Sequence, residues 1–202
     1  MILFSVIIPL YLPYKEHICE CLLSITEQSF DNFECLLVLP EEQIKEFKEL
    51  GLDLDWRFSV IVSKNPNQST NRNIGILHSK GDYIIFVDCD DKVDNDFLLH
   101  CYRDIYEFHP DLVVYGYSRS IDNLGKITQQ TPFYSADKNI INHLFFGCYT
   151  GKELLTNTSM ESVWCKAYKR KIICDNKILF DAETFIKSLK IITLKDNLET
   201  SK

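Results

Sequence analysis

Short apolar runs alternate with segments of helical periodicity through the first half of the chain. Short apolar runs predict strands over residues 3–8, 33–38, 58–62, 83–87 and 112–117. The first is rich in β-branched residues and fits a strand buried on both faces, and the second also fits a buried strand. Apolar positions at helical spacing and helix-boundary residues predict helices over about 13–28, 41–50, 70–79 and 94–110. This alternation predicts an α/β domain with a mostly parallel central sheet flanked by helices.

The helix after the fourth apolar run carries two further signals. Asp94 is a typical N-cap residue, so we expect the helix to begin there. One face of this helix carries Phe97, Cys101, Ile105 and Phe108, and we expect that face to pack on the core. Pro110 then ends it.

The alternation of strand and helix patterns ends after residue 118. Residues 122–125 indicate a turn between short extended pieces, and residues 139–146 indicate a helix. We therefore expect an α/β half over 1–117, a smaller and less regular extension of the same domain over 118–183, and an atypical Lys-rich tail over 184–202.

Composition and charge narrow the classes of partner. Of 202 residues, 46% are hydrophobic, which is enough for a sizeable core and argues against global disorder. The net charge of −7 argues against nucleic acid as a partner, because phosphate binding favours a basic surface. An acidic protein can still bind an anionic ligand when a divalent cation stands between them.

Cysteine usage and the N-terminal residues favour a cytoplasmic location. The eight cysteines include no Cys-x-x-Cys pair and fall largely within apolar runs, so we expect them to be reduced and mostly buried. The first residues lack a basic region and a cleavage site, so they are interpreted as a strand rather than a signal peptide. No apolar run reaches the roughly 18 residues that a membrane span requires.

The most informative polar cluster is Asp88-Cys89-Asp90-Asp91, directly after the fourth apolar run. Carboxylates at the end of a buried strand are held rigidly and still reach solvent. Hard oxygen ligands suit Mg²⁺ or Mn²⁺, which can bridge to phosphate. The alternative is a solvated acidic turn.

Three further segments could carry chemistry. The polar loop 65–75 enters a helix whose free N–H groups could bind an anion with help from Arg72; alternatively, the loop only caps the helix and Arg72 pairs with a nearby Asp. Tyr11 could stack on a flat base, or simply cover the sheet edge. In the segment 163–170, Trp164 could face a sugar; the alternative is a core Trp on a helix whose lysines form a solvated face.

In order and spacing, these segments resemble the family 2 glycosyltransferases, an inverting group with the GT-A fold. The resemblance rests on residues 4–11, 21–34, 71–75, 81–91 and 164–170, and it is dense from residue 3 to about 100. It implies a Rossmann-like GT-A fold in which the extension 118–183 lies on the acceptor side. It also implies a hexosyltransferase-type enzyme that moves a sugar, with inversion, from a nucleotide-sugar to a polysaccharide or lipid-linked acceptor.

The resemblance assigns roles to individual residues. Pro9 and Tyr11 would flank the base, usually uracil, and Arg72 would lie near the base or the diphosphate. Asp88 would bond the ribose or help to hold the metal, and Asp90 would ligate Mn²⁺ or Mg²⁺ directly. The expected donor is therefore a UDP-sugar. The resemblance leaves peripheral membrane association at the inner face open, and it fixes no oligomeric state.

Two departures from the family pattern matter. Where the family usually has acidic residues after the second strand, this chain has Leu39 and Pro40, so base recognition lacks its usual carboxylate unless Glu41 has taken over that role. No Glu-Asp pair follows residue 161, which leaves Asp181 and Glu183 as weak candidates for the catalytic base. The alternative function is therefore a catalytically inactive or truncated nucleotide-binding remnant of such an enzyme.

Overall fold

The computed structural model describes residues 2–64, 67–115 and 163–180, together with the backbone of three short strands between residues 118 and 149. The helical elements are η1 (Leu12–Tyr14), α1 (Lys15–Thr26), η2 (Glu41–Gln43), α2 (Ile44–Glu49), α3 (Gln68–His78), α4 (Phe97–Phe108) and α6 (Arg170–Asp175). The strands are β1 (Phe4–Pro9), β2 (Phe33–Pro40), β3 (Phe58–Ser63), β4 (Tyr83–Phe86), β5 (Leu112–Tyr115), β6 (Ser118–Ser120), β7 (Ile127–Gln130), β8 (Phe145–Tyr149) and β9 (Lys166–Lys169).

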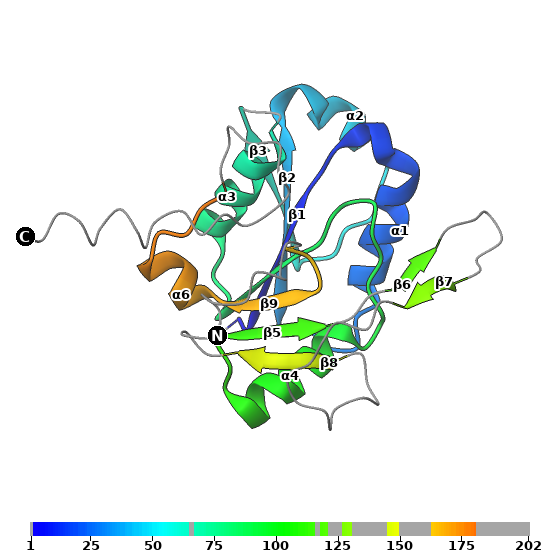
Figure 1. Cartoon of the computed structure of the whole chain (residues 1–202). Helices are drawn as coiled ribbons and strands as arrows, with labels where there is room; N and C mark the ends of the chain where they lie inside the picture. The colour runs from blue at the N-terminus through cyan, green and yellow to red at the C-terminus, as the bar shows by residue number, and fades with distance from the viewer. Residues whose placement is uncertain are drawn as a thin grey trace, which may run out of the picture.

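A seven-stranded sheet organises the described chain in the order β3-β2-β1-β4-β9-β5-β8 (Figure 1). β1 pairs in parallel with β2 and β4, and β2 pairs in parallel with β3. β9 lies antiparallel between β4 and β5, and β8 is antiparallel to β5. β1 to β5 therefore run one way and β8 and β9 the other, which confirms the mostly parallel α/β sheet.

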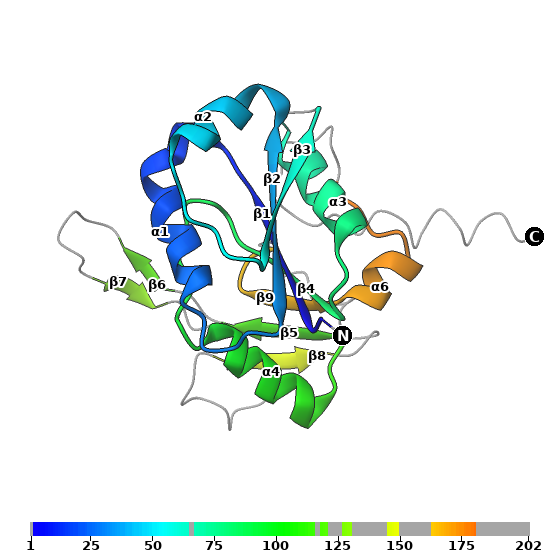
Figure 2. The ribbon, with the colours of Figure 1, turned by 180° about the vertical axis from the view of Figure 1, so that it is seen from behind.

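Helices cover both faces of the sheet (Figures 1 and 2). On one face, α1 and α4 pack on alternate residues of β1, including Phe4, Val6 and Ile8. On the other face, Ile76 of α3 and Ile173 of α6 pack with Ile7 and with residues of β2, β4 and β5. All residues of β1, β2, β4 and β5 are buried, which explains why these strands are continuous apolar runs rather than alternating ones.

Two polar side chains within these buried strands fix how the chain enters β4. Ser5 Oγ donates to Glu34 Oε1 at 2.7 Å, and the same carboxylate oxygen accepts from Lys80 N at 2.6 Å. Gly81 N donates to Ser5 Oγ at 2.8 Å. A β-carbon on Gly81 would lie 2.6 Å from the Phe4 carbonyl carbon, so only glycine fits where the chain crosses β1.

The start of α4 differs from the prediction. Its N-cap is Asp96, whereas Asp94 lies two residues earlier and accepts a hydrogen bond from Asp96 N at 3.0 Å. The Asp94 carboxylate thus stabilises the turn before the helix rather than the helix itself. The core face was also partly wrong: Leu98, Cys101 and Ile105 are buried, whereas Phe108 at the last turn is 49% exposed.

Three other expectations can be compared with the structure. The extended pieces flanking residues 122–125 are confirmed as the antiparallel pair β6 and β7, while those four residues lie outside the described residues. The predicted helix over 139–146 is wrong at its end, because residues 145 and 146 begin β8; residues 139–144 are not described. The tail 184–202 also lies outside the described residues.

The state of the cysteines and the lengths of the helices agree with what the sequence predicts. All seven cysteines whose side chains are described are free, and four of them are buried. In the described part of the chain, no helix is both long enough and apolar enough to cross a membrane.

Candidate functional site

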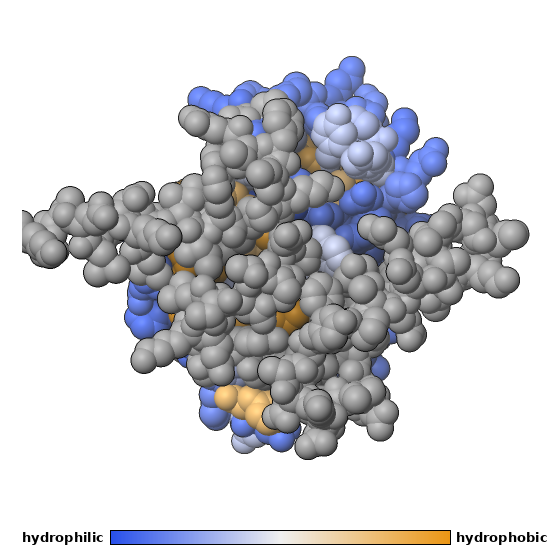
Figure 3. Space-filling view, in the orientation of Figure 1, coloured by the Kyte–Doolittle hydropathy of each residue, from blue (hydrophilic) through white to orange (hydrophobic). Residues whose placement is uncertain are grey.

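The carboxyl ends of β1, β2 and β4 face the same edge of the sheet, because β1 pairs in parallel with both of the others. β2 runs toward α2 at this edge (Figure 1). Leu10 N donates to Val38 O at 2.8 Å, and Val87 N donates to Ile7 O at 3.1 Å. The segments that follow β1, β2 and β4 therefore leave the sheet side by side. Leu12 N donates to Gln43 Oε1 at 3.0 Å, which ties η1 to η2. The described surface around α2 is hydrophilic (Figure 3). Ligands of open α/β sheets gather at such edges.

A buried ion pair joins α3 to the end of β4. Arg72 Nη2 lies 2.5 Å from Asp88 Oδ1, and the side chains are 1% and 9% exposed. Gln68 Nε2 also donates to Asp88 Oδ1, at 3.2 Å. The structure therefore confirms the alternative reading in which Arg72 pairs with a nearby Asp. Any contact of Arg72 with a base or diphosphate stays a prediction.

Asn67 explains why α3 begins where it does. It is the N-cap residue, and its side-chain oxygen accepts from Ser69 N at 2.8 Å and from Thr70 N at 3.3 Å. This cap starts the helix two residues before the predicted position and brings Gln68 and Arg72 to face Asp88.

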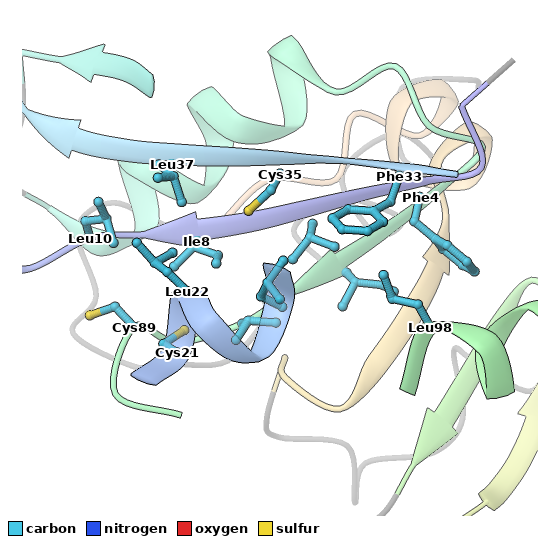
Figure 4. Packing of buried hydrophobic residues seen from close by; sticks show 14 of the residues in the cluster. Phe4, Ile8, Leu10, Cys21, Leu22, Phe33, Cys35, Leu37, Cys89 and Leu98 are labelled. Atoms are coloured by element: carbon cyan, nitrogen blue, oxygen red, sulfur yellow. The ribbon is translucent and has the colours of Figure 1, made fainter. Parts of the chain in front are cut away.

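Successive residues of the acidic turn face different surroundings. Asp88 is directed at Arg72, and the Asp88 carbonyl accepts from Asp91 N at 3.0 Å, which closes the turn. Cys89 lies beside Cys21 and Leu10 in the apolar cluster under β1 (Figure 4). Asp90 is exposed, and no hydrogen bond or ion pair to another described residue engages its carboxylate. One carboxylate is thus held in place and another is available at the rim.

Cys89 is buried in the apolar cluster rather than presented at the rim. Burial, together with the negative charges of Asp90 and Asp88, raises the pKa of the Cys89 thiol to about 11, although the Tyr11 backbone N–H opposes this shift. Mg²⁺ and Mn²⁺ prefer oxygen ligands, so the carboxylates of this turn suit such a cation better than the sulfur does. Among described residues, no three His, Cys, Asp or Glu side chains form a group that could hold a metal alone. A cation bound here would therefore need the Asp90 carboxylate together with oxygen atoms of a bound phosphate-containing ligand.

The end of α1 holds the segment that follows the acidic turn, and sequence reasoning missed this. Gln28 Nε2 donates to Asp94 O at 2.6 Å, and Leu98 N donates to Gln28 Oε1 at 2.9 Å. Val93 N donates to Ser24 Oγ at 3.2 Å. A glutamine at the end of a helical pattern carries no signal for such a role, because the partners Asp94 O and Leu98 N come from distant backbone.

The residues expected near a base lie where the chain leaves β1 and β2. Tyr11 is 47% exposed and packs edge-on against Tyr14, with ring centroids 5.4 Å apart. Pro9 is buried at the end of β1, and Leu39 and Pro40 are buried at the end of β2. Glu41 is exposed directly after β2, as is the neighbouring Glu42, so an acidic side chain is accessible to a ligand at this exit.

The segment around Trp164 forms a strand, so the alternative of a core Trp on a helix is wrong in its secondary structure. Trp164 makes an isolated bridge to Phe86, and β9 begins two residues later. Cys165 has a φ of 57°, a left-handed conformation that is uncommon for a side-chain-bearing residue. Burial, with added charge from Asp91 and Asp88, raises the pKa of its thiol to about 12. The segment therefore adjoins the acidic turn.

Lys166 contradicts the expected solvated basic face. It is 2% exposed on β9, and burial lowers the pKa of its amine to about 8. The strand was missed because two lysines and a tyrosine in four residues resemble an exposed surface. The two candidate bases, Asp181 and Glu183, lie outside the described residues.

Comparison with known proteins identifies the family of this chain. The model of "Glycosyl transferase family 2" matches residues 5–175. Glycosyltransferase GlyA of Streptococcus pneumoniae is 28% identical over 176 residues, covering 83% of this chain and 24% of the relative. Putative glycosyltransferase EpsH of Bacillus subtilis is 27% identical over 172 residues, covering 82% of this chain and 47% of the relative. The chain thus spans between a quarter and a half of these relatives.

A solved structure shows the same fold. TarS residues 1–349 of Staphylococcus aureus, in complex with UDP-GlcNAc, superpose with a TM-score of 0.64 at 20% identity, covering 89% of this chain and 49% of that one. The expected GT-A fold is confirmed by this likeness. With the family model matching most of its length, the chain belongs to glycosyl transferase family 2.

Proposed function

We propose that this chain binds a nucleotide-sugar, with UDP as the nucleotide, and takes part in transferring the sugar to a polysaccharide or lipid-linked acceptor with inversion. The observation that carries the proposal is the Arg72–Asp88 pair at the carboxyl end of β4, beside an exposed and unengaged Asp90. TarS, a poly(ribitol-phosphate) β-N-acetylglucosaminyltransferase, matches all of this chain at 23% identity and has the same fold with UDP-GlcNAc bound.

The arrangement supports a division of work between the two carboxylates. Asp88 is oriented by Arg72 and Gln68, so it can accept a bond from a ribose hydroxyl in a fixed direction. Asp90 faces solvent and supplies hard oxygen ligands for Mn²⁺ or Mg²⁺. The bound cation would neutralise charge on the departing diphosphate. Tyr11 and Glu41 lie just after the ends of β1 and β2, where they can contact the base of the nucleotide.

The transfer step also needs a group that removes the acceptor proton. Asp181 and Glu183 remain the candidates in this chain; they lie one and three positions after Phe180, the last described residue. In an inverting reaction such a carboxylate lets the acceptor hydroxyl attack the anomeric carbon opposite the leaving diphosphate.

Thermal unfolding tests the proposal. UDP, GDP and TDP are each added with and without Mn²⁺, because a ligand that binds only the folded state raises the melting temperature. The proposal expects the largest rise for UDP with Mn²⁺. No rise with any of the three nucleotides would overturn it.

A second function, nucleotide binding without transfer, rests on one sequence feature. No Glu-Asp pair follows residue 161, and the residues of the candidate base are atypical for the family. Turnover of a UDP-sugar panel distinguishes the two functions. Metal-dependent UDP binding without transfer or hydrolysis favours the second function, and robust transfer excludes it.

A further inference from the structure

Asn73, next to the buried arginine, holds a part of the chain that lies 107 positions away. Its Nδ2 donates to Phe180 O at 2.9 Å, and Phe180 N donates to its Oδ1 at 2.8 Å. One carboxamide therefore satisfies both backbone groups of Phe180, much as a neighbouring strand would. This reciprocal pair of bonds fixes the position and the orientation of the residue.

The ring that this clamp fixes lies against the ion pair. The Arg72 guanidinium carbon lies over the Phe180 ring, 5.2 Å from its centroid, and the ring packs edge-on against Phe86 at the same centroid distance. Phe180 is buried, so the cation–π contact is shielded from water. The clamp, the ring and the guanidinium thus form one contiguous set of contacts ending at Asp88.

The guanidinium needs such support. Its Nη2 is bonded to Asp88, but its Nε is buried and has no hydrogen-bond partner among the described residues. A planar group held at one nitrogen can rotate about that contact, and rotation would carry the Asp88 carboxylate with it. The Phe180 ring opposes this rotation because it covers the face of the guanidinium.

We infer that Asn73 is a positioning residue: through Phe180 it holds Arg72 in the orientation that aims Asp88 at the donor. This inference rests on the proposed function, because it assigns Asp88 to donor binding. The two neighbouring residues of α3 thus have complementary roles. Arg72 orients the Asp88 carboxylate, and Asn73 keeps Arg72 in place.

The first arm of the test needs no ligand. The Nε–Hε group of Arg72 is followed by NMR in the whole chain, and its exchange with solvent reports how firmly the guanidinium is held. Asn73→Ala removes the clamp, whereas Phe180→Leu keeps both backbone bonds and removes the ring. Both variants should raise the exchange rate by about tenfold or more, because a local opening then becomes easier. Asn176→Ala, which removes one exposed bond to Ile172 O, should leave the rate unchanged.

The second arm measures UDP affinity with Mn²⁺ well below the melting temperature. Asn73→Ala and Phe180→Leu should each weaken binding by about tenfold, and the double variant should be no weaker than the weaker single one, because both act through one path. Asn73→Asp, which can still accept from Phe180 N, should lie between Asn73→Ala and the unaltered protein.

The outcomes separate the inference from the proposed function. If the unaltered protein does not bind UDP, the proposed function fails, whatever the NMR arm shows. If it binds UDP and Asn73→Ala lowers only the melting temperature, with exchange and affinity unchanged, Asn73 is purely structural and the inference is overturned. Faster Arg72 exchange together with weaker UDP binding supports it.

Discussion

Arg72 and Asp88 form an ion pair at 2.5 Å in which both side chains are almost wholly shielded from water. Replacing one member leaves the other charge buried without this partner, which typically costs about 3–5 kcal/mol of stability. We expect Arg72→Met to lower the free energy of unfolding by that amount in urea denaturation. Lys171→Ala is the matched control, because the Lys171–Asp175 pair is exposed on α6. It should change stability by less than about 1 kcal/mol. Equal losses in the two variants would contradict the role of burial.

Asp90 should be required for metal-dependent UDP binding but not for folding. Its carboxylate is exposed and makes no hydrogen bond or ion pair with other described residues, so Asp90→Ala should leave the melting temperature within about 1–2 °C of the unaltered protein. The same variant should abolish the stabilisation that UDP gives with Mn²⁺. Asp82→Ala, an exposed aspartate at the other end of β4, serves as the control and should retain it. Unchanged metal-dependent binding in Asp90→Ala would remove the metal assignment.

Lys166 predicts a specific dependence of stability on pH. Burial lowers the pKa of its amine from 10.5 to about 8 in the folded chain, so the unfolded chain binds more protons between those values. This group therefore destabilises the fold fully below pH 8, and the penalty disappears as pH rises toward 10.5. Lys166→Met should be more stable than the unaltered protein at pH 7, by up to about 3 kcal/mol at roughly 1.4 kcal/mol per pH unit.

The difference between Lys166→Met and the unaltered protein is the quantity to follow. Buried thiols such as Cys101, whose pKa burial raises, weaken both proteins as pH rises above 9, and this contribution cancels in the difference. The difference should shrink steadily from pH 7.5 to pH 10. A difference that is constant across this range would show that the lysine does not titrate as its burial requires.

Gly81 should tolerate no side chain. A β-carbon would approach the Phe4 carbonyl carbon and Ser5 N, each at 2.6 Å, and backbone atoms inside a sheet cannot move aside easily. Gly81→Ala should lower the free energy of unfolding by about 1–3 kcal/mol in urea denaturation. Alanine at the neighbouring exposed Lys80 should have an effect within about 0.5 kcal/mol. A neutral Gly81→Ala would mean that β4 can shift against β1.

Much of the first half of the fold was predictable because β1, β2 and β4 are buried on both faces. Such strands are continuous apolar runs, and these can be located from sequence to within a residue or two, as with β2 (predicted 33–38, observed Phe33–Pro40). The edge strand β3 was also located, although Val60 and Val62 on it are exposed. The Asp88–Asp90 turn was found for the same reason, since it follows one of these runs. Helix starts were less accurate because they depend on side-chain caps, such as Asn67, that several neighbouring residues could supply.

Residues that act through distant partners could not be predicted. Gln28, Asn73 and Lys166 each owe their surroundings to segments that lie far away in sequence, and their local patterns resemble those of ordinary surface residues. The family resemblance indicated that a binding site lies around Asp88, but it did not predict that Phe180 packs against Arg72. That contact depends on how the chain after α6 returns to α3, and no local periodicity encodes it.

The position of β9 has a consequence for the order in which the protein can be made. β4 and β5 are separated in the sheet by a strand that comes from residues 166–169. During synthesis both strands leave the ribosome long before the segment that joins them. Until Lys169 emerges, the nascent chain holds two strand edges whose backbone groups lack their final partner. Completion of the sheet is therefore a late, long-range event, and a translation pause before residue 166 should prolong exposure to chaperones and to misassembly.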